Sequence, residues 1–307
     1  MESLPHAGNF RDLLVYQKAR RLSQDVFQLT LKFPNDEVYS LTSQIRRSSR
    51  SIHLISVHCS LSTVYWLTMI LVTSAGGKTG NAIVKALADR GQTIRAFARR
   101  EEQVSVLKAL GAGEVAISDV RDESAVRRAM EGARAVYHIC PNVNPEEQRI
   151  GELVIGAAQA TGVEHFVFHS VLHPQAEAMP HHWNKLRVEE ALFESGLPFT
   201  ILQPTAYMQN ILAGGQSIVE DGVFRVPYPV ETKLSLVDLE DVAEAAATVL
   251  TESNHADAAY ELVGAPPMTQ VEVADVLGQG LGRPVRAEAQ SVETWEERAR
   301  ASGMGDY

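Results

Sequence analysis

The sequence has only two cysteines, Cys59 and Cys140, in 307 residues. Neither lies in a metal-ligand spacing or in the C-x-x-C spacing of redox proteins, so the cysteines predict no metal site and no reactive dithiol. The chain also has no cationic, apolar leader, because Met1 to Phe10 is polar and mixed. We therefore expect a reducing, cytoplasmic location.

Long uncharged runs are scarce. One run, from Ser51 to Ser74, contains no Asp, Glu, Lys or Arg and is about as long as a membrane span. It includes polar residues such as His53 and His58, and its last part, Met69 to Thr73, is better explained as a buried strand. We expect no membrane association.

Basic residues are fewer than acidic ones, with 28 Lys and Arg against 38 Asp and Glu and a formal charge of -10. The acidic excess lies in residues 69–307, whereas residues 1–68 are net basic. An acidic body repels nucleic acid, so we expect no direct nucleic-acid partner. The 45% of hydrophobic and 21% of charged residues are typical of a globular protein.

Residues 10–33 have the spacing of an amphipathic helix. Apolar residues recur there every three or four positions, at Val15, Ala19, Leu22, Val26, Leu29 and Phe33. Pro34-Asn35-Asp36 ends this helix, and a second apolar stripe from Val38 to Ile52 predicts a helix that runs back beside it. We predict a helical hairpin over residues 1–52 and a junction at 53–68.

The hairpin resembles a known family. NFRDLLVYQKARRLSQDVFQLTLKF at 9–33, followed by YSLTSQIRR at 39–47, is similar to the first half of the small four helix bundle proteins of intervening sequences. Half a bundle cannot cover its own apolar stripe, so residues 10–52 are expected to pack on the main domain, form a homodimer, bind a protein partner or stay partly unfolded. A gene fusion or misplaced start, with Met69 as the original first residue, explains the segment equally well.

From Met69 onward, short apolar strands alternate with helices, which predicts an α/β fold with a doubly wound parallel (Rossmann) sheet. The predicted strands are 69–73, 93–98, 114–118, 134–139, 165–170 and 198–203, and the predicted helices 79–90, 102–110, 123–131, 146–161 and 181–195. Residues after Pro204 are less regular and predict a small α+β substrate lobe, mainly 204–307, with a helix at 242–250, a strand at 258–263 and a helix at 269–281. Because the polar end 293–307 stops abruptly, a truncated lobe is also considered.

The segment ILVTSAGGKTGNAIVKAL at 70–87 runs from a strand into a helix through a glycine-rich turn. Exposed N–H groups and the positive helix end at such a turn bind the pyrophosphate of a dinucleotide. The predicted cofactor-binding residues are Thr73, Ser74, Gly76, Gly77, Lys78, Thr79 and Gly80. A purely structural turn stays open, whereas a phosphate-binding NTPase loop is disfavoured because it needs a Gly where Val72 stands.

The end of the second strand decides which dinucleotide binds. An acidic side chain there bonds the ribose hydroxyls of NAD(H), and a cation holds the 2′-phosphate of NADP(H). Arg99 and Arg100 favour NADP(H), while the nearby Glu101 and Glu102 keep NAD(H) possible. Asp119, after the third strand, is expected either at the adenine edge or as a cap of the next helix.

Six segments together resemble the NmrA-like family of atypical short-chain dehydrogenases, over residues 69 to about 303. They are MILVTSAGGKTG, TIRAFAR, ISDVRD, GVEHFVFHSV, KLRVEEALFESGLPFTILQPTAYMQN and SLVDLEDVAEAA. The resemblance implies either an NAD(P)H-dependent reductase or a nucleotide sensor without turnover. Ser74 departs from the pattern, because extended short-chain dehydrogenases usually have the first Gly of G-x-x-G-x-x-G there.

Reductases of this wider group use a Ser after the fifth strand and a Tyr four residues before a Lys. Ser170 and Lys185 match two of these positions, and His181 stands at the Tyr position. Because a His can donate a proton near neutral pH, the resemblance implies Ser170, His181 and Lys185 as catalytic candidates. The alternatives are a strand-end cap for Ser170, an exposed helix start for His181 and a surface charge for Lys185.

The peptide after the sixth strand lies at the edge where open α/β sheets bind ligands, so Tyr207, Met208 and Asn210 are substrate candidates. A metal site is not expected, since His169 points away from the face of Ser170 and no carboxylate spacing supports one. We expect an NADPH-dependent oxidoreductase acting on a small carbonyl, enone or quinone. The alternative is a non-catalytic dinucleotide-sensing regulator.

Overall fold

The computed structural model describes residues 69–141 and 143–301. Its main sheet has seven strands in the order β10-β6-β5-β4-β1-β2-β3, and neighbours among β1 to β6 pair in parallel. The strands are β1 (Met69–Val72), β2 (Ile94–Ala98), β3 (Glu114–Ile117), β4 (Ala133–His138), β5 (His165–His169), β6 (Phe199–Pro204) and β10 (Ala258–Leu262). The strand order reverses between β1 and β4, which confirms the predicted doubly wound fold.

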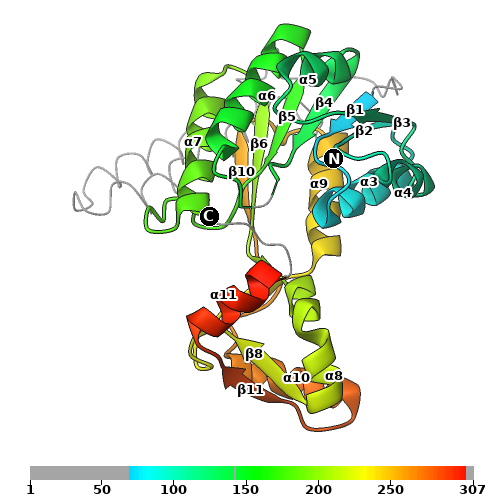
Figure 1. Cartoon of the computed structure of the whole chain (residues 1–307). Helices are drawn as coiled ribbons and strands as arrows, with labels where there is room; N and C mark the ends of the chain where they lie inside the picture. Colours follow the sequence, from blue (N-terminus) through cyan, green and yellow to red (C-terminus); the bar gives the residue numbers. More distant parts are fainter. Residues whose placement is uncertain (1–68, 142, 302–307) are drawn as a thin grey trace, which may run out of the picture. The chain divides into compact units, whose positions relative to one another are not determined.

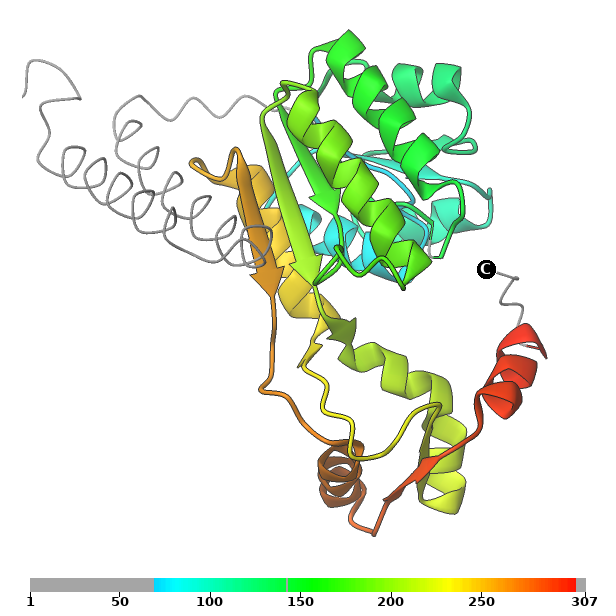
Figure 2. The same cartoon turned by 90° about the vertical axis from the view of Figure 1, so that its left-hand side faces the viewer.

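Helices cover both faces of this sheet, as Figures 1 and 2 show. One apolar cluster holds α5 (Glu123–Met130), α6 (Glu147–Thr161) and α7 (Pro180–Glu194) on one face. A second holds α3 (Lys78–Asp89), α4 (Gln103–Ala109) and α9 (Leu239–Thr251) on the other. Because both faces are buried, central strands such as β1 are continuously apolar, which made them recognisable in the sequence.

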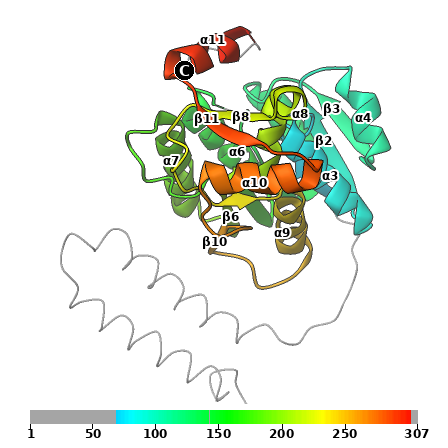
Figure 3. The ribbon, with the colours of Figure 1, turned by 90° about the horizontal axis from the view of Figure 1, so that it is seen from below.

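A small lobe with its own core follows β6, as predicted. The helix at 242–250 and the strand at 258–263 were wrongly assigned to it: they are α9 and β10 of the main domain, since the apolar stripe of α9 packs on the sheet and β10 pairs with β6 at its edge. Its elements are β7 (Ala206–Tyr207), the 3₁₀ helix η3 (Met208–Gly214), α8 (Gly215–Asp221), β8 (Val223–Val226), β9 (Leu236–Val237), α10 (Gln270–Leu281), β11 (Arg286–Ala289) and α11 (Val292–Ala301). β8 pairs in parallel with β11, β7 with β9, and α10 packs beside β8 and β11 (Figure 3).

The predicted hairpin at 1–52 and the junction at 53–68 lie outside the described residues. Within the described ranges, every helix is too short or too polar to cross a membrane.

Candidate functional site

The glycine-rich turn joins β1 to α3 at the point where the strand order reverses. Gly77 is the N-cap of α3 in an extended conformation, and a Cβ built there would have Ser74 O, at 3.5 Å, as its nearest neighbour. A Cβ at Gly80 would instead lie 2.6 Å from Ala75 Cα. The turn therefore needs Gly80 for its own packing, whereas Gly77 leaves space in front of the helix N-terminus.

Replacing Gly80 by Ala is expected to destabilise the fold, because the new methyl group meets backbone atoms that cannot rotate away. We expect a loss of roughly 1–3 kcal/mol in the free energy of unfolding, measured by urea denaturation. Gly77→Ala is the matched control and should unfold within about 1 kcal/mol of the wild type, the difference expected from backbone entropy alone. Equal stabilities for Gly80→Ala and the wild type would contradict the packing of this turn.

Ser74 has a positive φ of 47°, in the left-handed region that favours glycine. This geometry explains why the related pattern has Gly at this position. The turn keeps its shape with Ser at a cost of about 1 kcal/mol in backbone strain.

Thr73 does not present its side chain on the turn. It is 1% exposed, and its Oγ1 lies 2.9 Å from His138 Nδ1 and accepts a hydrogen bond from the Ile139 N–H at 3.0 Å. The Thr73 side chain therefore connects the end of β1 to the end of β4 through these hydrogen bonds.

Gln103 is a residue at this turn that the sequence analysis missed. Its Nε2 donates to Gly76 O at 3.0 Å, and its Oε1 accepts from the Arg100 N–H at 3.1 Å. The side chain fills the space where a Cβ of Gly76 would stand. A polar residue at the start of α4 gave no local signal of this contact, which connects the turn to the end of β2.

Arg99 and Arg100 are exposed at the end of β2, as a 2′-phosphate site requires. Asp119, at the end of β3, is bound by Arg121 through two side-chain contacts of 2.7 and 2.9 Å. Hydrogen bonds from Arg121 lower the pKa of Asp119 to about 2, and the charge of Arg99 acts in the same direction. The capping alternative for Asp119 is wrong, because Asp122 accepts from the Ala125 N–H and caps α5.

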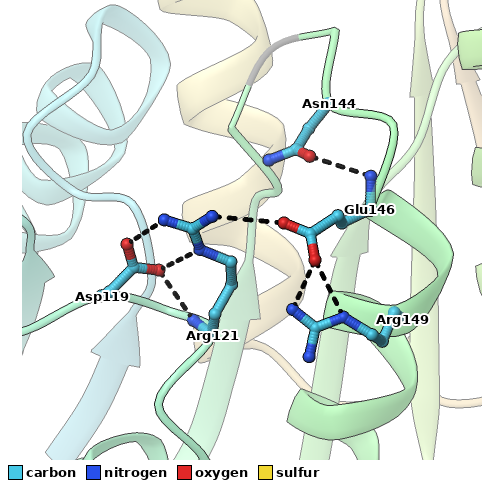
Figure 4. Close-up of polar contacts among 5 residues, drawn as sticks. All are labelled: Asp119, Arg121, Asn144, Glu146 and Arg149. Carbon is cyan, nitrogen blue, oxygen red and sulfur yellow. Dashed lines mark hydrogen bonds and ion pairs between the residues drawn. The ribbon is translucent and has the colours of Figure 1, made fainter.

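Arg121 also connects the loop after β3 with the start of α6 (Figure 4). Its Nη1 donates to Glu146 at 3.2 Å, and the same carboxylate accepts from Arg149 at 2.6 Å. The Asn144 side chain accepts from the Glu146 N–H at 2.9 Å. These charged groups are exposed, so the ion pairs add little to stability, and Arg121 serves mainly to position Asp119.

Lys185 is held in a largely buried ion pair. Its Nζ lies 2.5 Å from Glu147 Oε1 and donates to the His169 carbonyl at 3.2 Å. Glu147 is 1% exposed, and burial raises the pKa of its carboxyl while Lys185 opposes this rise. Lys185 is therefore not the solvated surface charge of the alternative interpretation.

Ser170 is 2% exposed, and its Oγ donates to Glu189 Oε1 at 2.5 Å. The same carboxylate oxygen accepts from Gln203 Nε2 at 2.8 Å. His181 lies half-buried at the start of α7, where its ring packs edge-on against that of His182, with 4.6 Å between the ring centroids. Burial, followed by the charges of His182 and Lys185, lowers the pKa of His181.

The substrate candidates meet the first turn of α3. Tyr207 Oη lies 2.6 Å from His169 Nε2 and 3.5 Å from Thr79 Oγ1, and Lys78 Nζ donates to Asn210 Oδ1 at 3.3 Å. Met208 begins η3 between them. The structure therefore brings Tyr207 and Asn210 to the turn. No cluster of three His, Cys, Asp or Glu suitable for a metal occurs among residues 69–141 and 143–301.

Comparison with known proteins identifies the family. The NmrA-like family matches residues 67–299. The chain belongs to the NmrA-like family. Within it, the chain is 32% identical over 241 residues to the NAD(P)H azoreductase of Xenophilus azovorans, and the match covers 77% of this chain and 82% of that relative. It is 28% identical over 240 residues to quinone oxidoreductase 2 of Escherichia coli K12, and this match covers 78% of this chain and 83% of the relative.

Two solved structures of this fold resemble the NmrA-like chain. The Escherichia coli quinone oxidoreductase QOR2 complexed with NADPH has a TM-score of 0.68 at 27% identity, covering 77% of this chain and 84% of that one. The Citrobacter sp. triphenylmethane reductase complexed with NADP(H) has a TM-score of 0.68 at 26% identity, covering 78% and 85%. A second family, the 23S rRNA-intervening sequence protein, matches residues 11–55 of this NmrA-like chain. Both predicted resemblances are thus confirmed.

Proposed function

We propose that this NmrA-like chain is an NADPH-dependent oxidoreductase that reduces a small carbonyl, enone or quinone. The observation that carries the proposal is the turn at 74–80, which exposes the N-terminus of α3 where the strand order reverses. Relatives named as an NAD(P)H azoreductase and a quinone oxidoreductase support the same chemistry.

The cofactor would lie along the carboxyl ends of the strands. The Gly77 N–H donates to the Ser74 carbonyl, so a pyrophosphate would lie on the N–H groups of Lys78 and Thr79 at the start of α3. The open space at Gly77 suits this position, because a Cβ there would obstruct it. Arg99 and Arg100 would hold the 2′-phosphate, and Asp119, fixed by Arg121, would meet the adenine edge. NAD(H) would bind at the same turn more weakly, since it lacks the phosphate that pairs with these arginines.

The reacting end would be formed by the strand ends of β5 and β6. When bound, the reduced nicotinamide supplies a hydride. Lys185, fixed by Glu147 and the His169 carbonyl, places a positive charge beside β5, where it would stabilise negative charge on an acceptor oxygen. Ser170 and His181 are the other catalytic candidates, and Tyr207, Met208 and Asn210 are those for substrate contact.

A panel of quinones, azo dyes, aldehydes and enones with NADPH, followed at the nicotinamide absorbance, tests this proposal. We expect turnover of at least one acceptor class, faster with NADPH than with NADH. Gly77→Val is the control, because its side chain fills the space in front of α3 and should abolish activity with every acceptor. NADPH binding without oxidation anywhere in the panel would overturn the proposal.

A dinucleotide sensor without turnover is the second candidate. His181 at the position of the usual Tyr, and the engagement of Ser170 with buried Glu189, favour it. A sensor would bind NADPH at the same turn, leave every acceptor unreduced and change its affinity for a protein partner with NADPH occupancy.

Residues 10–52 are a further candidate interaction segment, since 11–55 match the 23S rRNA-intervening sequence protein. Removing residues 1–68 tests this directly. A change in oligomeric state would support a homodimer or partner role. Unchanged solubility, oligomeric state and nucleotide binding would show that the rest of the chain does not need the segment.

A further inference from the structure

His169 is held between two tyrosines at the end of β5. Its Nδ1 lies 2.7 Å from Tyr137 Oη, and its Nε2 lies 2.6 Å from Tyr207 Oη. Tyr137 is 0% and His169 6% exposed. Burial, with smaller effects from the charges of Lys185 and His138, lowers the pKa of His169 to about 3, so the imidazole is neutral at pH 7. A neutral imidazole has one N–H donor and one acceptor nitrogen.

Burial of Tyr137 decides which nitrogen carries the proton. Its phenol must donate somewhere, because a buried hydroxyl proton without an acceptor costs about 1–3 kcal/mol. His169 Nδ1 is the acceptor within hydrogen-bond distance, so Nδ1 carries the lone pair. The proton of His169 is then on Nε2, which donates to Tyr207 Oη.

This arrangement leaves the phenolic proton of Tyr207 pointing away from His169. Tyr207 is partly exposed, and its Oη lies 3.5 Å from Thr79 Oγ1, in the first turn of α3. Burial raises the pKa of Tyr207 to about 12, so the phenol is protonated at neutral pH. The Thr79 hydroxyl donates to Tyr207 Oη, as His169 Nε2–H does, so the phenolic proton stays available to an acceptor at the turn.

We propose that Tyr207 donates a proton to the carbonyl oxygen of the acceptor, and that Tyr137 and His169 position it for this step. This inference rests on the proposed reductase function. NADPH is the reductant: its hydride carries the electron pair to the acceptor, NADP⁺ is left, and the acceptor oxygen takes the Tyr207 proton. The O–H bond of Tyr207 breaks, and the resulting phenolate accepts from His169 Nε2–H until water returns a proton.

Tyr207→Phe is the direct test, with a quinone as acceptor and NADPH as reductant. Loss of a general acid typically lowers the rate about 100- to 10,000-fold, so kcat should fall by that factor while the NADPH dissociation constant stays within about twofold. The dissociation constant of the quinone from the NADP⁺ complex, where no hydride is available, should rise about threefold to tenfold for one lost hydrogen bond. Tyr228→Phe, which removes another partly buried phenol, should match the wild type in all three measurements.

The positioning of Tyr207 by Tyr137 and His169 is tested by measuring the tautomer of His169. In ¹⁵N NMR of the His169 side chain, Nδ1 should have the shift of an unprotonated nitrogen and Nε2 that of a protonated one. Tyr137→Phe removes the donor that fixes this tautomer, so it should shift both resonances toward tautomer averaging and lower kcat about tenfold, with the NADPH dissociation constant unchanged.

Two results would overturn the inference alone: a wild-type His169 protonated on Nδ1, or a Tyr207→Phe chain that reduces quinone as fast as an active wild type. A wild-type chain that binds NADPH but reduces no acceptor would overturn the proposed function together with the inference.

Discussion

The free energy of unfolding is expected to fall by several kcal/mol as the pH is lowered from about 6.5 toward 3. His138 and His169 are almost wholly buried, and burial, with a smaller effect of the Lys185 charge, lowers the pKa of each to about 3. An unfolded His has a pKa of about 6.5, so below that pH the unfolded chain binds protons that the folded chain does not. Each His then lowers the free energy of unfolding by about 1.4 kcal/mol for each pH unit that the pH falls.

The sign of this effect is specific to buried neutral histidines. Their contribution to stability is complete above the unfolded pKa and is lost as the pH falls toward the folded pKa. Glu147 acts in the opposite direction, because its raised pKa makes protonation favour the folded state. Because one carboxyl group opposes two imidazoles, the free energy of unfolding should still fall as the pH is lowered.

Urea unfolding at pH steps from 7 to 4 measures this slope. His138→Gln removes one titrating group and keeps an amide that can bond Thr73, so it should roughly halve the pH dependence between pH 6 and 4. His173→Asn, at an exposed position, is the control and should leave the slope unchanged. A wild-type stability that is constant from pH 7 to 4 would contradict the burial of both imidazoles.

Arg99→Ala is expected to weaken NADPH binding about 10- to 100-fold and to change NADH binding little. A charge-assisted contact to phosphate contributes about 1.5–3 kcal/mol, and each 1.4 kcal/mol is a factor of ten in the dissociation constant. NADH has no 2′-phosphate and so has no such contact to lose. Calorimetric titration with both nucleotides measures the two constants.

Two variants serve as controls for this prediction. Gly77→Val should weaken both nucleotides alike, because it obstructs the pyrophosphate that they share. Arg127→Ala removes another exposed arginine, on α5, and should change neither constant. Equal losses of NADPH and NADH binding in Arg99→Ala would contradict the assignment of Arg99 to the phosphate.

The sequence predicted six of the seven strands of the main sheet because they are short, mostly apolar runs between helical stripes, whereas β10, which follows the small lobe's first elements in the chain, was assigned to that lobe. The six strands up to β6 and the five helices between them lie within one residue of their predicted ends. The elements it missed, such as β7 and β9, are only two residues long and have no periodicity to detect. α11 was missed because its face is polar and none of its residues is buried.

The site was predictable only where a local pattern encodes it. The spacing of Gly77 and Gly80 identified the turn. Gly80 is required because the first turn of α3 lies against the backbone of Ala75, and Gly77 leaves the start of the helix open. Glu147 and Glu189 gave no such signal, because each resembles an ordinary helix acid until the fold buries it against Lys185 or Ser170. The role of His169 likewise depends on tyrosines from two other strands, Tyr137 on β4 and Tyr207 on β7.

The central claim, hydride transfer from an NADPH bound at the turn between β1 and α3, is tested most directly by a single-turnover reaction. The wild-type chain is mixed without oxygen with one equivalent of NADPH and an excess of quinone, and nicotinamide absorbance and hydroquinone are measured together. We predict loss of one NADPH for each hydroquinone formed, and no reaction in Gly77→Val. NADPH that stays bound and unoxidised in the wild type would contradict the claim.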